Sequence, residues 1–184
     1  RGDYWHGQPN YVEVWVESNA LGPTLKHFLK DRHVLVVPNK GYTSLAYVNK
    51  NCERIKKMCQ YYKPDNIHIL YYGDRDPSGN QMFEYIKQRF KDLGVSSRVK
   101  PKWVAITEEQ IRKYHLPKLP INWNDPRAKT FPGKYAVELD AMIAYKPKEF
   151  EKLVQKSVDD LYDKKIYDAM VKEYETLPED PEEI

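Results

Sequence analysis

Apolar residues along the chain gather into short runs, and longer segments of helical spacing separate these runs. The runs predict four strands, at Tyr11–Val16, His33–Val37, Ile67–Tyr72 and Val99–Ile106. The spacing between them predicts helices at Leu21–Leu29, from Thr43 or Ser44 to about Tyr62, and at Gly79–Leu93. Strands that alternate with helices are typical of an α/β fold with a parallel, doubly wound sheet. We therefore expect a Rossmann-like core over residues 11–106, with a parallel four-stranded sheet flanked by helices.

The second half of the chain is less regular. Residues 107–146 are interpreted as a loop and accessory segment, which opens on a short helix at Thr107 and contains a long loop from Leu116 to Gly133. Residues 147–178 have apolar positions at helical spacing, which predicts an amphipathic C-terminal helical extension, either continuous or broken near Asp163. Residues 1–10 show no period and are expected to be the frayed remnant of a preceding element. Residues 179–184 form an acidic tail.

Acidic residues follow two of the predicted strands. Glu17 directly follows the first strand, and Asp74 and Asp76 follow the third. The carboxyl ends of parallel strands meet at one edge of a sheet, so these side chains are expected to lie close together. Neighbouring carboxylates repel each other unless a cation neutralises them, and Mg²⁺ typically takes one or two protein carboxylates together with phosphate oxygens. The alternative is an Asx turn, in which Asp-Pro-Ser-Gly only caps the following helix.

The order of these elements resembles the Toprim domain shared by topoisomerases, bacterial primases and OLD-type nucleases. The resemblance covers roughly Tyr11 to Val104, and its motif Gly-Asp-x-Asp-Pro-Ser-Gly is most similar to the branch that contains the A subunit of type IIB topoisomerases and the meiotic break-making protein, and to related phage and archaeal proteins. Residue by residue, the match covers the first acid, the Asp-x-Asp pair and two glycines, namely Glu17, Asp74, Asp76, Gly41 and Gly79. Many members carry Lys directly after the first acid, where this chain has Ser18.

The resemblance implies an enzyme that cleaves nucleic-acid phosphodiester bonds with Mg²⁺ or Mn²⁺, as a nuclease or as the cleavage half of a topoisomerase-like complex acting on DNA. In that interpretation Glu17 is the general acid or base, and Asp74 and Asp76 hold the metal together with it. The alternative is a non-catalytic nucleic-acid-binding or assembly module that retains a metal site. Nucleotidyl transfer, as in primases, is a third hypothesis.

Further residues are candidates for supporting roles. Lys40 and Gly41 follow the second strand and are expected to approach a phosphate, although Lys40 is equally well interpreted as an exposed turn lysine. Ser78 and Gly79 open a helix, whose N-terminal amides bind anions. Arg127 is a candidate phosphate clamp in the long loop. The pair Glu138 and Asp140 repeats the i, i+2 spacing and is either a second metal position or two solvated acids.

Composition adds expectations about partners and location. The net charge is +3, and residues 1–174 carry 30 Lys and Arg against 22 Asp and Glu, which is compatible with a polyanionic partner or with an ordinary lysine-rich surface. No apolar run approaches the ~20 residues of a membrane helix. Cys52 and Cys59 would lie about 10 Å apart on one helix, too far for a disulfide, which favours an intracellular location. Since the chain begins at Arg1, a preceding domain or a partner subunit is expected, with a homodimer as the alternative.

Overall fold

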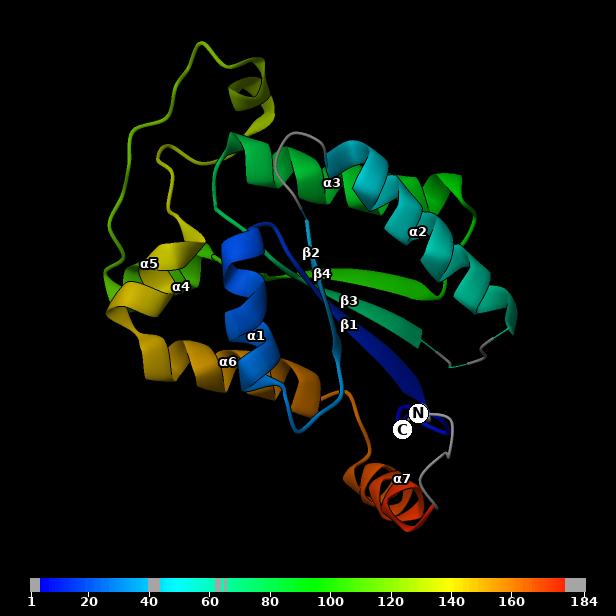
Figure 1. Ribbon diagram of the computed structural model, residues 1–184. Helices are drawn as coiled ribbons and strands as arrows, with labels where there is room; N and C mark the ends of the chain where they lie inside the picture. The colour runs from blue at the N-terminus through cyan, green and yellow to red at the C-terminus, as the bar shows by residue number, and fades with distance from the viewer. Residues whose placement is uncertain (1–3, 40–43, 62–63, 65, 178–184) are drawn as a thin grey trace.

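The fold is built on one parallel sheet. The computed structural model describes residues 4–39, 44–61, 64 and 66–177. Its strands are β1 (Asn10–Val16), β2 (Leu35–Pro38), β3 (Asn66–Tyr72) and β4 (Val99–Ala105), in the spatial order β2-β1-β3-β4. Every pairing between them is parallel (Figure 1). The prediction of a four-stranded parallel sheet is therefore confirmed, as is the Rossmann-like arrangement.

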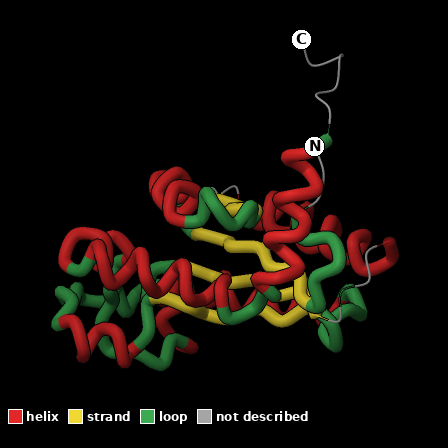
Figure 2. The backbone as a smooth tube through the Cα atoms, turned by 90° about the horizontal axis from the view of Figure 1, so that it is seen from below, coloured by secondary structure: helices red, strands yellow, loops and turns green. Residues whose placement is uncertain are grey.

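Helices cover both faces of the sheet, and the strands lie between these helical layers in Figure 2. One face carries α2 (Ser44–Tyr61) and α3 (Pro77–Asp92). The other face carries α1 (Gly22–Phe28), α4 (Glu108–Tyr114), α5 (Leu139–Tyr145) and α6 (Pro147–Asp159). The remaining helices are α7 (Lys164–Thr176) and two short 3₁₀ helices, η1 (Asn19–Leu21) and η2 (Pro126–Thr130).

The two central strands contribute side chains to both layers, because successive residues of a strand point to opposite faces. Val14 and Leu70 pack beneath α1 and α6, whereas Trp15 and Tyr71 pack beneath α2 and α3. All four side chains are at most 1% exposed. This burial on both faces explains why β1 and β3 are so apolar in sequence. It also fixes the positions of the residues that follow the two strands.

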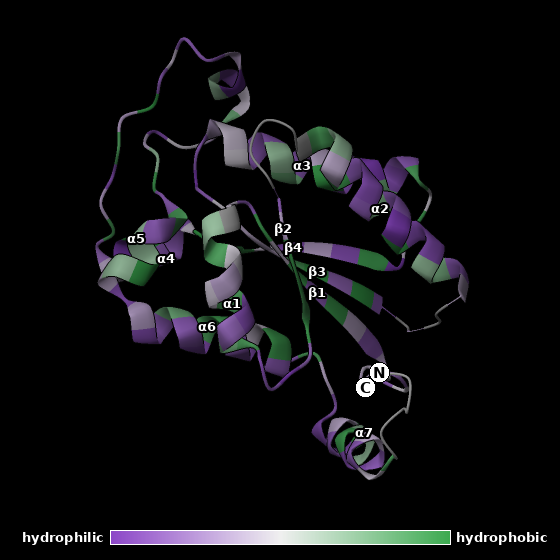
Figure 3. Ribbon diagram, viewed as in Figure 1, coloured by the Kyte–Doolittle hydropathy of each residue, from purple (hydrophilic) through white to green (hydrophobic). Residues whose placement is uncertain are grey.

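Several boundaries differ from the sequence-based expectations. The second strand was expected to begin at His33, but β2 begins at Leu35, whose side chain is 48% exposed, while Val36 and Val37 are buried in the two opposite core layers. Helix α3 begins two residues before the predicted Gly79, because Asp76 caps it. The C-terminal extension is broken, as one alternative predicted: Asp163 accepts hydrogen bonds from the amides of Lys165 and Ile166 at 2.9 and 3.1 Å and starts α7. Figure 3 shows hydrophilic and hydrophobic segments mixed along α6 and α7, in keeping with amphipathic helices.

The segment before β1 is packed rather than frayed. Trp5 is 3% exposed, and its indole nitrogen donates to the carbonyls of Arg32 and His33, each at 3.2 Å. Gln8 exchanges hydrogen bonds with the backbone of Asp163, so this segment also holds the start of α7. In the ranges that the structure describes, no helix combines the length and apolar character required to cross a bilayer.

Candidate functional site

The carboxyl ends of three strands lie level with one another. Val16 pairs with Pro38 on one side and with Tyr72 on the other, so the next residues of the three strands are Glu17, Asn39 and Gly73. The ladder continues past the strand ends: the amide of Glu17 donates to the carbonyl of Tyr72 at 2.9 Å, and the amide of Asn39 donates to that of Val16 at 2.7 Å. This register brings polar residues far apart in sequence to one edge of the sheet.

Glu17 is held tightly at that edge. Its Oε2 accepts a hydrogen bond from the backbone amide of Asp74 at 2.8 Å. The same oxygen occupies space left by two glycines: a Cβ atom on Gly73 would lie 2.7 Å from it, and one on Gly79 would lie 3.2 Å from it. The carboxylate of Glu17 therefore lies in a cradle that only residues without a side chain can form.

The two aspartates of the Asp-x-Asp pair have different local roles. Asp74 Oδ1 accepts a hydrogen bond from the amide of Leu139 at 2.7 Å, which ties the third strand to the start of α5. Asp76 Oδ1 accepts from the amide of Gly79 at 2.6 Å and is the N-cap of α3. The capping alternative is thus correct for Asp76, yet it does not remove this residue from the site, because Asp76 also lines the same pocket as Asp74 and Glu17.

Burial and mutual repulsion disfavour negative charge on these carboxyls. Burial, and next the charge of Asp74, raises the pKa of Glu17 to about 8. Burial is also the main reason that the pKa of Asp74 is raised to about 6, partly offset by the hydrogen bond from Leu139. The pKa of Asp76 is raised by burial, against hydrogen bonds from the Gly79 and Ser78 amides and the charge of Arg127. Elevated pKa values in a cleft are typical of functional sites.

The second acidic pair lies on the same edge of the sheet. Val137 pairs with Arg75 in an isolated antiparallel bridge, and the Leu139 amide binds Asp74, so the flanking Glu138 and Asp140 are held beside the Asp-x-Asp pair. Their charges contribute to the raised pKa of Asp74. Both side chains are exposed. Among the described residues, however, no three acidic, histidine or cysteine side chains already converge as a metal-ligand group.

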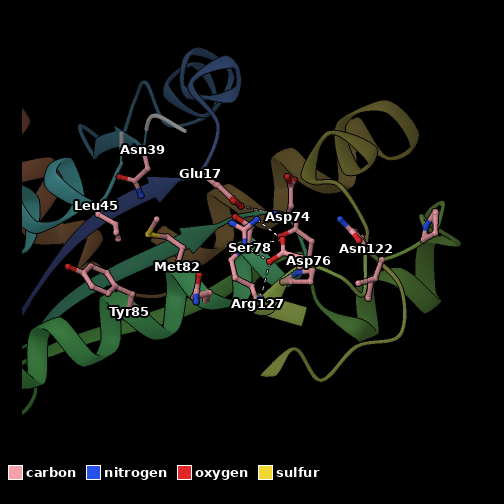
Figure 4. Close-up of a pocket in the computed structure, with 16 residues that line it drawn as sticks. Glu17, Asn39, Leu45, Asp74, Asp76, Ser78, Met82, Tyr85, Asn122 and Arg127 are labelled. Atoms are coloured by element: carbon pink, nitrogen blue, oxygen red, sulfur yellow. Dashed lines mark hydrogen bonds and ion pairs between the residues drawn. The ribbon is translucent and has the colours of Figure 1, made fainter. Parts of the chain in front are cut away.

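A pocket of about 730 Å³ opens at this edge. Figure 4 shows its two ends: Glu17, Asp74, Asp76, Ser78 and Arg127 gather at one end, and Asn39, Leu45, Met82 and Tyr85 lie toward the other. The first end is built from the termini of β1 and β3, the start of α3 and η2, and the second from the residue after β2 and the facing sides of α2 and α3. The remaining walls come mainly from the long loop, through Pro120, Ile121, Asn122 and Asp125.

The long loop from Leu116 to Gly133 is ordered around a small apolar cluster of Ile121, Ala128 and Phe131. It carries Arg127 to the acidic end of the pocket, where the guanidinium pairs with Asp125, with Nη2 2.6 Å from Oδ2 and Nε 3.0 Å from Oδ1. The charge of Arg127 also opposes the raised pKa values of Glu17 and Asp76. The loop thus brings both the guanidinium of Arg127 and the carboxylate of Asp125 to the site.

Other predicted phosphate contacts turn out differently. Ser78 and Gly79 were expected to offer their amides to a phosphate, but these amides bind Asp76, which is the anion at this helix N-terminus. We therefore assign both residues to holding Asp76. Lys40 and Gly41 lie outside the described residues.

The sequence analysis missed two residues of the site. Gly73 was treated only as part of the motif, although it directly precedes Asp74 and shapes the cradle of Glu17. Asn39 was treated as part of a turn, yet it is 2% exposed and lines the pocket. Its position directly after the second strand, level with Glu17, is the signal that identifies it.

Comparison of the chain with known protein families, with curated proteins and with solved structures found no match.

Proposed function

We propose that this protein cleaves nucleic-acid phosphodiester bonds with the help of Mg²⁺ or Mn²⁺, and that its sheet and acidic edge form a Toprim-like catalytic domain. The observation that carries the proposal is the meeting of Glu17, Asp74 and Asp76 at one pocket, from two strands whose termini are level. The Toprim assignment itself rests on the motif Gly-Asp-x-Asp-Pro-Ser-Gly and on the Rossmann-like order of the elements.

The donor set suits a hard divalent cation. The three side chains offer only carboxylate oxygens, and each carboxylate has a second oxygen beyond the one that accepts a backbone amide. Burial and mutual repulsion make negative charge on these three carboxylates unfavourable, and a bound cation would offset that cost. We assign Asp74, Asp76 and Glu17 to the principal position, and Glu138 and Asp140 to a second one. A bound divalent cation would supply charge stabilisation at the scissile phosphate.

Glu17 is the residue best suited to move a proton. A general acid or base works best when its pKa lies near the operating pH, and burial has raised the pKa of Glu17 to about 8. Its Oε2 is fixed by the amide of Asp74, which leaves Oε1 to face a reacting group. Arg127 lies at the same end of the pocket, where it is placed to pair with a phosphate once it exchanges Asp125 for that ligand.

A second candidate function is a nucleic-acid-binding module without catalysis. One observation favours it: the described side chains do not converge as a ready metal-ligand group. Such a module would bind nucleic acid in a salt-dependent manner without breaking a bond.

Supercoiled plasmid with Mg²⁺ or Mn²⁺ separates the two functions. Nicked, linear or relaxed products are expected from the wild-type protein, and Glu17→Gln is expected to lower the rate by about 10²–10⁴-fold, the usual contribution of a general acid or base. Glu109→Gln, an exposed acid on α4, is the matched control and should cleave like wild type. Calorimetry should show Mn²⁺ binding that Asp74→Asn with Asp76→Asn removes. Salt-dependent binding of the plasmid without any product would select the binding module, and unchanged Mn²⁺ binding in the double variant would refute the metal site.

A further inference from the structure

The apolar end of the pocket is not used by the proposed chemistry. It is lined by Leu45 of α2 and by Met82 and Tyr85 of α3 (Figure 4). Leu45 is 51% exposed. Tyr85 is held in place by donating its hydroxyl hydrogen to Asn49 Oδ1 at 2.7 Å, so its ring is a fixed wall. The result is a firm apolar surface that continues from the carboxylates.

The polar group beside this surface is Asn39. It is 2% exposed, and within the part of the chain that the structure describes neither its Nδ2 nor its Oδ1 has a hydrogen-bond partner. Buried amides are nearly always paired, because leaving a buried polar group unpaired is unfavourable. The terminal torsion of asparagine is broad, so the amide can turn toward a ligand that offers it both an acceptor and a donor. An unpaired donor and acceptor at a pocket wall therefore indicate a ligand with the complementary pair.

We propose that this end of the pocket is a nucleobase subsite with a preference for adenine, in which Asn39 pairs with the base edge and Leu45, Met82 and Tyr85 contact its faces. This inference rests on the proposed function, which makes the substrate a nucleic acid, and it adds which base of that substrate the same pocket binds. An asparagine amide matches adenine N6 and N7 as a bidentate partner. Stacking on apolar and aromatic side chains accepts any base and adds affinity without selectivity.

The size and polarity of the pocket agree with this assignment. Its volume of about 730 Å³ lies within the range of roughly 300–1,000 Å³ of small-ligand sites, and greatly exceeds what one phosphate fills. The acidic end would hold the phosphate with its metal, and the apolar end would hold an adjacent base. Since a base must leave its stack to enter, the substrate is a single strand or a locally opened duplex.

Neutral deoxynucleosides, titrated in EDTA and followed by NMR, test the subsite without metal and without a phosphate that the carboxylates would repel. Deoxyadenosine should bind about five- to hundredfold more tightly than deoxycytidine, the range of a bidentate amide–adenine pair. Asn39→Leu should remove this preference and leave the other nucleosides within about twofold. Met82→Ala should weaken all four nucleosides. Gln60→Leu, which changes an exposed amide on α2 outside the pocket, should leave the affinities unchanged.

Asn39→Leu is expected to fold, because no hydrogen bond within the described residues is lost. Its denaturation midpoint should be equal to or above that of wild type. A preference for deoxyadenosine that persists in Asn39→Leu, the absence of any preference, or no binding at millimolar nucleoside would each overturn the proposal. The nucleoside titration is independent of cleavage: binding as expected without plasmid cleavage refutes only the proposed function, and cleavage without base preference refutes only the subsite.

Discussion

At the scale of single residues, the acidic site depends on what Gly79 lacks. Its position in the first turn of α3 brings the backbone against the end of β3, and a Cβ atom there would collide with the carbonyl oxygen of Asp74. The same atom would lie 3.2 Å from both Asp76 Oδ1 and Glu17 Oε2. The absence of a methyl group thus lets the start of α3 lie close to the Asp74 backbone and to the side chains of Asp76 and Glu17.

Gly79→Ala should therefore damage the site and the fold together. Forcing a methyl group into a packed region costs about 1–3 kcal/mol, and here the backbone of Asp74 must move to admit it. We expect a lower denaturation midpoint in urea and a loss of Mn²⁺ binding by calorimetry.

Gly94→Ala is the matched control, because a Cβ atom there meets nothing within 4 Å while a positive φ of 72° still makes alanine unfavourable. This variant should lose stability but keep wild-type Mn²⁺ affinity. Equal Mn²⁺ affinity in Gly79→Ala and Gly94→Ala would show that the close approach at Gly79 has no role in the site.

At the scale of elements, the first turn of α3 couples a helix cap to the candidate metal site. Asp76 receives the Gly79 amide as N-cap, with Pro77 as the first helical residue, so the start of the helix is set by the same side chain that faces the pocket. Pro at this position loses no hydrogen bond and is preorganised for the helix. The carboxylate is thereby held in one orientation before any ligand binds.

Two substitutions at Asp76 separate these roles. Asn caps helices as well as Asp does, whereas Ala does not, and loss of a cap costs about 0.5–2 kcal/mol. Asp76→Asn should keep the wild-type stability in urea denaturation but weaken Mn²⁺ binding, because it removes a charged ligand. Asp76→Ala should lose both. A stability loss in Asp76→Asn as large as that in Asp76→Ala would mean that the charge, not the cap, stabilises the helix.

The sequence predicted the elements better than their ends. The apolar runs of β1 and β3 are unambiguous because both faces of these strands are buried, and the acids that follow them mark the site edge. The sequence does not reveal the register between β1 and β2. The residue that lies beside Glu17 after the end of β2 follows only from that pairing, so Asn39 was overlooked. The Leu139 amide that binds Asp74 is a backbone group, and its role depends on tertiary contact rather than on residue type.

Glu13 gives a further example of this limit. It lies in the middle of β1 and is fully buried, where an apolar residue would be expected. Arg54 of α2 pairs with both of its oxygens at 2.6 and 2.7 Å, and the indole nitrogen of Trp15 donates to it at 3.1 Å. A buried charge is tolerated because it is paired and hydrogen-bonded, and such a partner, 41 residues away, is visible only in the fold.

At the scale of the whole molecule, the segment before β1 and the helix α7 are tied together at the amino ends of the strands, opposite the site. Asn10, the first residue of β1, donates to the carbonyl of Leu161, and Tyr167 of α7 hydrogen-bonds to His33 at 2.6 Å. Figure 1 shows α7 near the start of β1, away from α5 and the long loop. These stabilising contacts and the candidate site thus lie at opposite ends of the same strands, so the acidic edge can carry unfavourable charge within a well-packed fold.

That unfavourable charge should appear in the pH dependence of stability. The folded-state pKa of Glu17, about 8, and that of Asp74, about 6, both exceed the ordinary values of 4.5 and 3.8. A raised carboxyl pKa contributes stability that is complete below the ordinary pKa and is lost as the pH rises through the folded value. Without metal, the free energy of unfolding should therefore fall between about pH 4 and 8, by at most about 1.4 kcal/mol per pH unit for each proton, and the melting temperature should fall with it.

Mg²⁺ should oppose this trend, because carboxylates must be deprotonated to bind a metal. We expect saturating Mg²⁺ to raise the melting temperature more at pH 8 than at pH 6, as followed by calorimetry. Glu17→Gln should flatten the metal-free decline between about pH 6 and 8, where Glu17 is the group that titrates, while Glu109→Gln keeps the wild-type slope. If Mg²⁺ shifts the melting temperature equally at both pH values, the cation binds elsewhere than at these buried carboxylates, and the metal-dependent function proposed for this edge would have to be abandoned.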